Sequence, residues 1–283
     1  MMLKIKNMIP DEFDVADGII QSAFGRTNSM REEIQIFYDS QPDGLFIAYI
    51  KEKAIGTGAI VDYGTYSFIG MMNVLKEHQR KGYGRIIFDH LLRWGGKIKT
   101  PLIYLDASDM GRGLYEQRGF KALDKSIDYQ INSMPDRLTI PNRYGIRIIE
   151  LSDLDDLVDF DKPFFGGNRR EILKNMIRVS PPRGFIAFEN CKISGYIIAR
   201  SQEIGPWIAK TPDVAETLLQ VALTLPYERN PSIVVPESNK MVINILKRHQ
   251  FEKKAINTHM VLGSNQAISD RQSIFAQIGH GLG

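Results

Sequence analysis

The chain has 283 residues, 43% of them hydrophobic, which is enough for two domains with ordinary apolar cores. Its 36 basic residues against 33 acidic ones leave a formal net charge of +3, which is too small to require nucleic acid as a partner. A single cysteine, Cys191, excludes an internal disulfide and a cysteine-based zinc site, and the five histidines show no metal-ligand spacing. We therefore expect no metal site.

The N-terminal segment, residues 1–12, has neither the long apolar core nor the small-residue cleavage site of a secretory signal. No apolar run approaches the ~20 residues that cross a membrane. Together with the cysteine content, this predicts a soluble cytoplasmic protein that has no membrane partner.

The first predicted elements are a helical region, Phe13–Ser40, and a strand, turn and strand over Phe46–Gly56. A glycine-containing break at Phe24–Asn28 interrupts the helical region and is a candidate wall for a binding pocket. Tyr63 and Tyr66 follow the second strand, and such an aromatic pair indicates sheet packing more often than a substrate clamp.

A strand-like run, Phe68–Val74, is joined to an amphipathic helix by a basic turn that contains Gly82 and Gly84. Glycine lacks a Cβ atom, so the backbone can take a positive φ and approach a ligand closely. The N–H groups that open the following helix point at such a ligand along the positive end of the helix dipole. The turn therefore predicts an anion cradle suited to a pyrophosphate, made of Gln79, Arg80, Lys81, Gly82, Tyr83, Gly84 and Arg85.

Two better-known phosphate loops do not fit this turn. The dinucleotide fingerprint needs G-x-G-x-x-G and the nucleotide P-loop needs G-x-x-x-x-G-K with Ser or Thr, whereas the turn reads Q-R-K-G-Y-G. A plain helix-capping turn is the other interpretation. Further along, Pro101–Ser108 predicts a strand, and Gly111–Phe120 a short helix ended by glycine.

A linker is predicted near Met134–Gly145, where two prolines and polar residues interrupt the periodicity. Ile146–Leu151 then predicts a strand, and the tail from Gly263 holds one candidate short helix, Asp270–Ile278. We divide the chain into domains at residues 1–140 and 145–262, with a tail at 263–283.

The chain also repeats itself. Phe46–Gly56 aligns without gaps onto Phe185–Gly195 at an offset of 139, and Leu114–Phe120 onto Ile245–Phe251 at an offset of 131. Eight residues are therefore missing from the middle of the second copy, where the Q-R-K-G-Y-G turn has no counterpart. Thr211, followed by proline, makes an ordinary helix N-cap there. We expect one anion site per chain, in the first unit.

The turn, as Gln/Arg-x-x-Gly-x-Gly/Ala, and the later L-Y-E-x-x-G-F at Leu114–Phe120 resemble the two signatures of the GNAT superfamily of N-acetyltransferases, in the family's order. The tandem layout resembles a bacterial-type family with a GNAT domain followed by a divergent GNAT-like domain, and this resemblance covers nearly the whole chain. It implies an α/β (α+β) fold of two tandem domains, each a mixed, mostly antiparallel sheet flanked by helices. Weaker markers in the second half are Asp161–Arg169, Gly195–Arg200, Ile204–Pro206 and Val235–Asn239.

The resemblance implies an acyltransferase that moves the acetyl group of acetyl-CoA, a cosubstrate, to an amine in a ternary complex. It places the backbone groups of Met72, Asn73 and Val74 on a splayed strand, where they bind the pantetheine arm and the thioester oxygen. Tyr115 stands where the family has a phenol near the sulfur, and a hydroxyl of pKa ~10 can protonate or hydrogen-bond the departing thiolate. Packing of the helix on the sheet is its alternative role.

The sequence does not decide which group acts as the general base. Many GNAT enzymes carry a glutamate on the splayed strand, whereas this chain reads Met71–Asn73 there. Asp62 and Asp106, near strand ends, are candidate bases, and a water chain is a further option. Glu77 is expected on the exposed rim of the cradle.

The acceptor is predicted to be a small amine, such as an amino acid or a related metabolite, between Phe13–Ser40 and the second domain. Asp161–Arg169 either closes the pocket from the other side or only connects helices. Two other interpretations stay open: a non-catalytic acyl-CoA-binding sensor, favoured by the missing strand carboxylate, and a protein or peptide acetyltransferase. The sequence fixes neither the acyl-chain length nor the oligomeric state, so a homodimer stays among the options.

Overall fold

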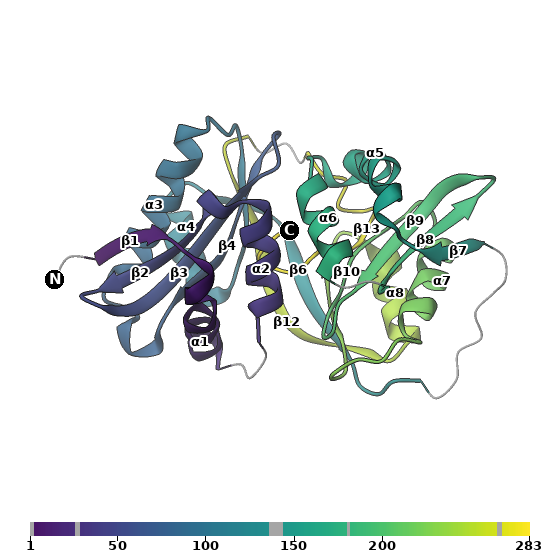
Figure 1. Ribbon diagram of the computed structural model, residues 1–283, viewed down its shortest axis with the longest axis horizontal. Helices are drawn as coiled ribbons and strands as arrows, with labels where there is room; N and C mark the ends of the chain where they lie inside the picture. Colours follow the sequence, from purple (N-terminus) through teal and green to yellow (C-terminus); the bar gives the residue numbers. More distant parts are fainter. Residues whose placement is uncertain (1–2, 26–28, 136–143, 180–181, 265–267) are drawn as a thin grey trace.

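The computed structural model describes residues 3–25, 29–135, 144–179, 182–264 and 268–283. It has two lobes, each built on a sheet with helices packed against it, and the end of the chain lies between them (Figure 1). The larger sheet has the strand order β1-β2-β3-β4-β5-β12-β6-β11, and the smaller one β13-β10-β9-β8-β7. Pairing is mostly antiparallel, as in the predicted fold class, which is confirmed.

The first unit contains these elements: β1 (Leu3–Asn7), η1 (Pro10–Glu12), α1 (Phe13–Phe24), α2 (Arg31–Ser40), η2 (Pro42–Gly44), β2 (Leu45–Ile50), β3 (Lys53–Asp62), β4 (Ser67–Val74), η3 (Lys76–His78), α3 (Tyr83–Lys97), β5 (Ile103–Ala107), α4 (Asp109–Glu116) and β6 (Lys121–Ile131). The second unit contains these: β7 (Gly145–Ile148), η4 (Leu151–Asp153), α5 (Leu154–Phe165), α6 (Arg170–Val179), β8 (Gly184–Glu189), β9 (Lys192–Ala199), β10 (Ile204–Ala209), α7 (Pro212–Ala222), β11 (Ser232–Pro236), α8 (Lys240–Arg248), β12 (Phe251–Leu262) and β13 (Ile274–Ala276). Within the described residues, no helix is long and apolar enough to span a membrane.

Local sequence signals set the helix boundaries. α1 ends at Gly25, whose φ of +62° is left-handed and suits a residue without a Cβ atom. α7 begins at Thr211, whose hydroxyl accepts from the Val214 N–H group, as expected for the N-cap predicted there. Asn239 caps α8 in the same way. The second unit thus starts its helix after β10 with a capping side chain, while the first unit uses a glycine turn.

The last strands of the two units are exchanged. β12, from the second unit, lies between β5 and β6 and is antiparallel to both. β6 in turn pairs with β11 of the second unit. β6 and β12 are the strands that follow the repeated helix, at Phe120 and Phe251. The larger sheet is therefore completed by strands from both halves of the sequence.

The tail does not form the expected helix over Asp270–Ile278, so that prediction was wrong. Instead β13 pairs with β10, and the next residue, Gln277, donates its backbone N–H group to the Val234 carbonyl of β11 at 2.9 Å. Residues 274–278 are buried, because the tail fills the space between these two strands. Apolar burial and strand pairing outweigh the weak helical pattern of the segment.

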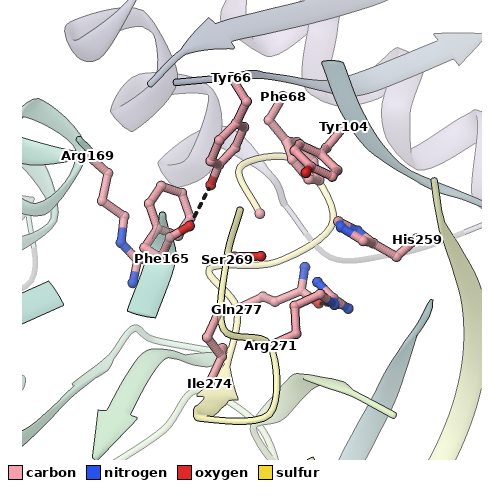
Figure 2. Close-up of a pocket in the computed structure, with 11 residues that line it drawn as sticks. Tyr66, Phe68, Tyr104, Phe165, Arg169, His259, Ser269, Arg271, Ile274 and Gln277 are labelled. Carbon is pink, nitrogen blue, oxygen red and sulfur yellow. Dashed lines mark hydrogen bonds between the residues drawn. The ribbon is translucent and has the colours of Figure 1, made fainter. Parts of the chain in front are cut away.

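The seam between the lobes is apolar and tightly packed. Tyr63 and Tyr66 are both buried here, and their hydroxyls donate to the carbonyls of Leu282 and Phe165. Figure 2 shows the Tyr66 contact beside a gap of about 20 Å³. That volume accommodates roughly one water molecule, so the gap is too small for a substrate. The two tyrosines serve as packing residues, as expected.

Candidate functional site

The predicted cradle is the turn between β4 and α3. Gly82 is the N-cap of α3 with a φ of +84°, and Arg80 is left-handed as well, at +59°. No side chain caps this helix, so the first N–H groups of α3 point out of its end. A Cβ atom built on Gly82 would meet no heavy atom within 4 Å of it, so the space in front of these groups is open. The turn therefore fits an anionic group on geometric grounds.

The side chains of the cradle divide into two groups. Gln79 donates to the Val74 carbonyl at 3.0 Å, and Lys81 donates to the Glu77 carbonyl at 2.8 Å. These bonds hold the turn against the end of β4. Arg80, Lys81 and Arg85 are exposed and add positive charge to the turn. Glu77 is exposed and pairs with Lys53 at 3.1 Å, which places it on the rim, as expected.

β4 and β5 diverge next to the cradle. Their parallel pairing runs from Ser67 to Ile69 on β4 and is not continued by the next residues of the described strands. Met71 has a φ of +50°, at the irregularity in the pairing of β4 with β3. From there to Val74, β4 is paired with β3 alone, so its other edge faces an opening. Met72, Asn73 and Val74 lie along this opening.

A cavity of about 440 Å³ lies at the splay between β4 and β5. Both units build it: α1, α2, β4 and α4 come from the first unit, and β12 and the tail from the second. Its lining includes Ile20, Phe24, Met30, Glu33, Met71, Met72, Asn73, Asp106, Asp109, Tyr115, Asp128, Glu203, Ile256, Asn257, Gly279 and His280. The cavity and the cradle thus lie at two ends of one opening in the sheet.

Tyr115 reaches the cavity from α4. It packs on Phe88 at a centroid distance of 4.8 Å, and a Cβ atom on Gly111 would come within 3.0 Å of its ring. Burial raises the pKa of the Tyr115 hydroxyl to about 12. The phenol is therefore protonated at neutral pH and can act as a hydrogen-bond donor in the cavity.

Asp106 is the centre of a polar network at the cavity wall. Its buried carboxylate accepts from His259 Nδ1 at 2.8 Å and from His280 Nδ1 at 3.0 Å. The other ring nitrogen of His280 lies 2.9 Å from Asp128 Oδ2. One imidazole thus bridges two carboxylates, one from β5 and one from β6, and fixes the tail across the mouth of the cavity.

The protonation states of this network follow from burial and charge. Burial acts against the anion of Asp106, but the hydrogen bonds from His259 and His280 outweigh it and hold the pKa of this carboxyl well below its usual range. Burial also acts against the His280 imidazolium, but Asp128 and Asp106 raise its pKa to about 10. His259 is different, because burial lowers its pKa despite Asp106. Asp106 is therefore a weak proton acceptor that holds His280.

The other sequence candidates lie elsewhere. Asp62 is exposed and accepts from the Gly64 N–H group, so it caps a turn and is not in the cavity. Arg169 and Asp161 form a buried ion pair at 2.6 Å that also contacts Tyr196, which gives the Asp161–Arg169 segment a structural role. Of the Phe24–Asn28 break, Phe24 lines the cavity, and residues 26–28 lie outside the described part of the chain.

Sequence reasoning did not identify the contribution of the tail. His280 lies 174 residues from Asp106, and Glu33 and Glu203 reach the cavity from different units. The one available signal was the pattern Gly279-His280-Gly281, a histidine between glycines. A Cβ atom on Gly70 of β4 would lie 2.2 Å from the Gly281 carbonyl oxygen, so the tail backbone crosses the splayed strand in direct contact.

A glycine turn beside a splayed strand is the arrangement that the resemblance to the GNAT superfamily implies. Two sequence models of one family match the chain: one described as Acetyltransferase (GNAT) family covers residues 16–120, and one described as Acetyltransferase (GNAT) domain covers residues 157–276. The chain belongs to the GNAT superfamily of acetyltransferases and carries two GNAT domains in tandem.

Several known proteins and solved structures are similar to this chain. The holothin acyltransferase of Pseudoalteromonas sp. (strain SANK 73390) is 22% identical over 224 residues, which are 77% of this chain and 74% of that protein. The uncharacterized N-acetyltransferase YitH of Bacillus subtilis (strain 168) is 27% identical over 161 residues, 56% of each chain. The crystal structure of a candidate acetyltransferase from Pyrococcus horikoshii superposes with a TM-score of 0.87 at 26% identity, covering 99% of this chain and 96% of that one.

Proposed function

We propose that the protein is an acetyl-CoA-dependent N-acetyltransferase that transfers the acetyl group directly to a small amine, an amino acid or a related metabolite, in a ternary complex. The observation that carries this proposal is the single opening between β4 and β5, with the cradle at one end and the cavity at the other. Donor and acceptor would enter from opposite sides and meet at the splayed strand.

The residues of the cradle suit the pyrophosphate of acetyl-CoA. The open N–H groups of α3 would bind phosphate oxygens, with Arg80, Lys81 and Arg85 adding charge. The free edge of β4 at Met72–Val74 would hold the pantetheine arm by backbone hydrogen bonds. One donor site per chain is proposed, because the second unit lacks the turn.

The cavity residues support aminolysis of a thioester. The amine nitrogen attacks the thioester carbonyl carbon, a C–N bond forms, the C–S bond breaks, and the leaving sulfur needs a proton. Tyr115 would donate that proton from its hydroxyl, and the proton lost by the amine restores the phenol through water in the cavity. The raised pKa of Tyr115 keeps the donor protonated between turnovers.

The size of the cavity favours a small acceptor over a peptide. Pockets of ~300–1,000 Å³ hold compact ligands, and about 440 Å³ falls in the lower part of that range. The name of one relative, holothin acyltransferase, supports acyl transfer as the reaction but concerns that protein's own substrate.

The test is release of free thiol from acetyl-CoA over a panel of small amines, amino acids and short peptides, with mass spectrometry of the products. We expect amine-dependent release and an N-acetyl product. Tight acetyl-CoA binding with no release on any amine would instead support an acyl-CoA sensor, and activity confined to peptides would support a protein acetyltransferase.

A further inference from the structure

Asn73 of β4 carries a buried hydrogen-bond acceptor that has no donor among the described residues. Thr57 donates its hydroxyl proton to the Met71 carbonyl at 2.7 Å, so its oxygen can only accept from the Asn73 amide, which lies at 3.3 Å. The Nδ2 atom of Asn73 therefore faces Thr57. Within the described part of the chain, Oδ1 is the unpartnered atom of a side chain that is only 4% exposed. An unpaired buried acceptor is costly, which indicates that a ligand supplies the donor.

The Asn73 side chain lies on the face of the larger sheet that is opposite α3. Cβ atoms built on Gly56 and Gly58 of β3 would each come within 2.8 Å of Ile87, so these two positions face α3. Side chains alternate along a strand, so Thr57 points to the opposite face, and so does Asn73, which is its direct partner in the ladder of β3 and β4. α1 packs against β3 and β4 on that side (Figure 1). The amide is therefore on the side where we expect the acceptor.

The Asn73 oxygen is directed towards the edge of β4 at the splay. The amide nitrogen reaches back to β3, so the oxygen lies on the other side of the amide group. The described pairing of β4 with β5 ends at Ile69, and the edge beyond it opens into the cavity of about 440 Å³. Asn73 lines this cavity and Thr57 does not. A ligand at the splay can therefore reach Oδ1 while Nδ2 stays inside the sheet.

We propose that Asn73 Oδ1 accepts a hydrogen bond from the attacking amine and orients the lone pair of that amine towards the thioester carbonyl carbon. This inference rests on the proposed function and adds a substrate-orienting residue to it. A neutral primary amine has two N–H groups. One of them bonds to Asn73, and the other gives its proton to water in the cavity as the C–N bond forms. The C–S bond breaks and the sulfur takes its proton from Tyr115. The remaining N–H stays on the amide product and keeps its bond to Asn73.

Thr57 acts through Asn73 as a positioning residue. Its single hydroxyl proton goes to the Met71 carbonyl, so an Asn73 amide turned by half a rotation would bring two oxygens together with no proton between them. The threonine thus keeps the amide oxygen, and not the NH₂ group, on the side of the ligand. Without the hydroxyl both orientations become accessible, and one of them presents a donor to the N–H groups of the amine.

Variants of the full-length protein test both roles by steady-state kinetics. Asn73→Leu keeps a branched side chain but removes the acceptor, so kcat/KM for primary amines should fall by ~10-fold or more. Thr57→Val should lower it by a smaller factor, and Thr57→Ser, which retains the hydroxyl, should restore it. Asn175→Leu replaces a buried asparagine of α6 that bonds to Ser40 outside the cavity, so it is the matched control and should change nothing. Wild-type kinetics in Asn73→Leu would overturn the proposal, and equal losses in Thr57→Val and Thr57→Ser would contradict the positioning role.

Paired amines give a readout that a purely structural role would not change. The pairs are n-butylamine with N-methylbutylamine, benzylamine with N-methylbenzylamine, and glycine with N-methylglycine. A secondary amine has one N–H group, which it cannot both donate to Asn73 and give up. In wild type, the primary amine of each active pair should therefore have the higher kcat/KM, by ~10-fold. In Asn73→Leu this ratio should fall towards one, whereas a steric effect of the methyl group would persist. An identical ratio in both proteins would overturn the proposal, and Asn73→Ala replaces Asn73→Leu if the latter does not fold.

Calorimetry with acetyl-CoA distinguishes failure of this inference from failure of the proposed function. Asn73→Leu should bind acetyl-CoA within about twofold of wild type, because the amide oxygen contacts the acceptor and not the donor. A large loss of affinity would assign the bond of Asn73 to the pantetheine arm, which overturns this inference and leaves the transferase in place. No thiol release from wild type with any amine would instead remove the transferase, and this inference with it.

Discussion

In both GNAT units, two neighbouring strands of the sheet separate at the equivalent position. The two units differ in what fills the space between those strands. In the first unit, β4 and β5 separate after three paired residues, and the space beside them is the cavity. In the second unit, an isolated parallel bridge joins Glu203, just before β10, to Ser232 of β11, and the chain's own β13 pairs with β10 beyond it. One splay is available to a ligand, and the other is occupied by a strand.

The difference extends to the turn that follows each splay. The first unit reaches its helix through Gly82, open in front, and the second through Thr211, closed by its own side chain. The repeated helix shows the same divergence, because Leu246 of the second unit aligns with Tyr115. Residue 250 nevertheless keeps the left-handed conformation of Gly119, with φ values of +60° and +86°. The second unit has kept the backbone of a GNAT domain and lacks the groups that we propose to bind the donor.

The same substitution in each splay should have opposite consequences. Gly82→Asp adds a Cβ atom and a negative charge in the open cradle, so it should abolish acetyl-CoA binding by steric exclusion and repulsion. Its apo melting temperature should fall by only a few degrees, since nothing in the protein contacts that Cβ atom and the positive φ of residue 82 is a modest strain for an aspartate. Gly205→Asp should instead damage folding, because its Cβ atom would lie 1.9 Å from the Gln277 carbonyl oxygen.

Calorimetry with acetyl-CoA and thermal melts of both variants check this pair. Wild-type affinity in Gly82→Asp would show that the cradle is misassigned. Native stability in Gly205→Asp would show that the tail is not packed as the structure has it.

The comparison also predicts one acetyl-CoA per chain. β13 and Gln277 occupy the second splay through backbone hydrogen bonds to β10 and β11, which a donor would have to displace. Calorimetric titration of the wild-type protein should give a stoichiometry of one. A value near two would mean that the tail leaves the second splay.

Tyr115→Phe should lower kcat by roughly 10²-fold or more and leave the affinity for acetyl-CoA nearly unchanged, because it removes a proton donor and keeps the ring. Tyr129→Phe, a buried tyrosine of β6 outside the cavity, is the control and should not alter kcat. Steady-state kinetics with the best amine of the panel measure both. An undiminished kcat in Tyr115→Phe would mean that Tyr115 only packs its helix against the sheet and donates no proton.

The smallest expected effect concerns the pH dependence of stability. The pKa of His280 is raised to about 10 between Asp128 and Asp106, so its stabilising contribution is complete below ~6.5, the ordinary value, and is lost as the pH rises through the folded value. The melting temperature of wild type should therefore exceed that of His280→Gln most at pH 6 to 7, by roughly 5 °C, and converge on it towards pH 10. A difference that is constant over this range would mean that His280 is not charged in the folded protein.

Local pattern and motif could predict much of this molecule. The strand, glycine turn and helix around Gly82 are contiguous in sequence, and so is the helix that carries Tyr115. The duplication could be detected because each repeated segment is also contiguous in sequence. The strand exchange was not, because β12 matches β6 in pattern, and only the three-dimensional pairing decides which of them lies beside β5.

The sequence could predict the residues on the donor side of the candidate site. It predicted far fewer of the residues on the acceptor side. Asp106 was one of two candidate bases, and sequence could not separate it from Asp62, which caps a turn. The structure separates them by burial and by the two histidines that bind Asp106. Both histidines come from residues 259–283, and no periodicity in sequence relates them to a strand near residue 106.

The exchanged strand β12 also determines the order in which parts of the larger sheet can fold during synthesis. β5 ends at Ala107, and its neighbour β12 begins at Phe251, roughly 150 residues later in synthesis. Until that strand arrives, the edges of β5 and β6 that it will cover have no partner from β12, and unpaired edges invite pairing with other chains. The cavity wall, which needs β12 and the tail, is the last part to form. Most of both units is therefore synthesised before the cavity wall can form, and mutations that slow the docking of β12 should cause aggregation of new chains before they affect the folded protein.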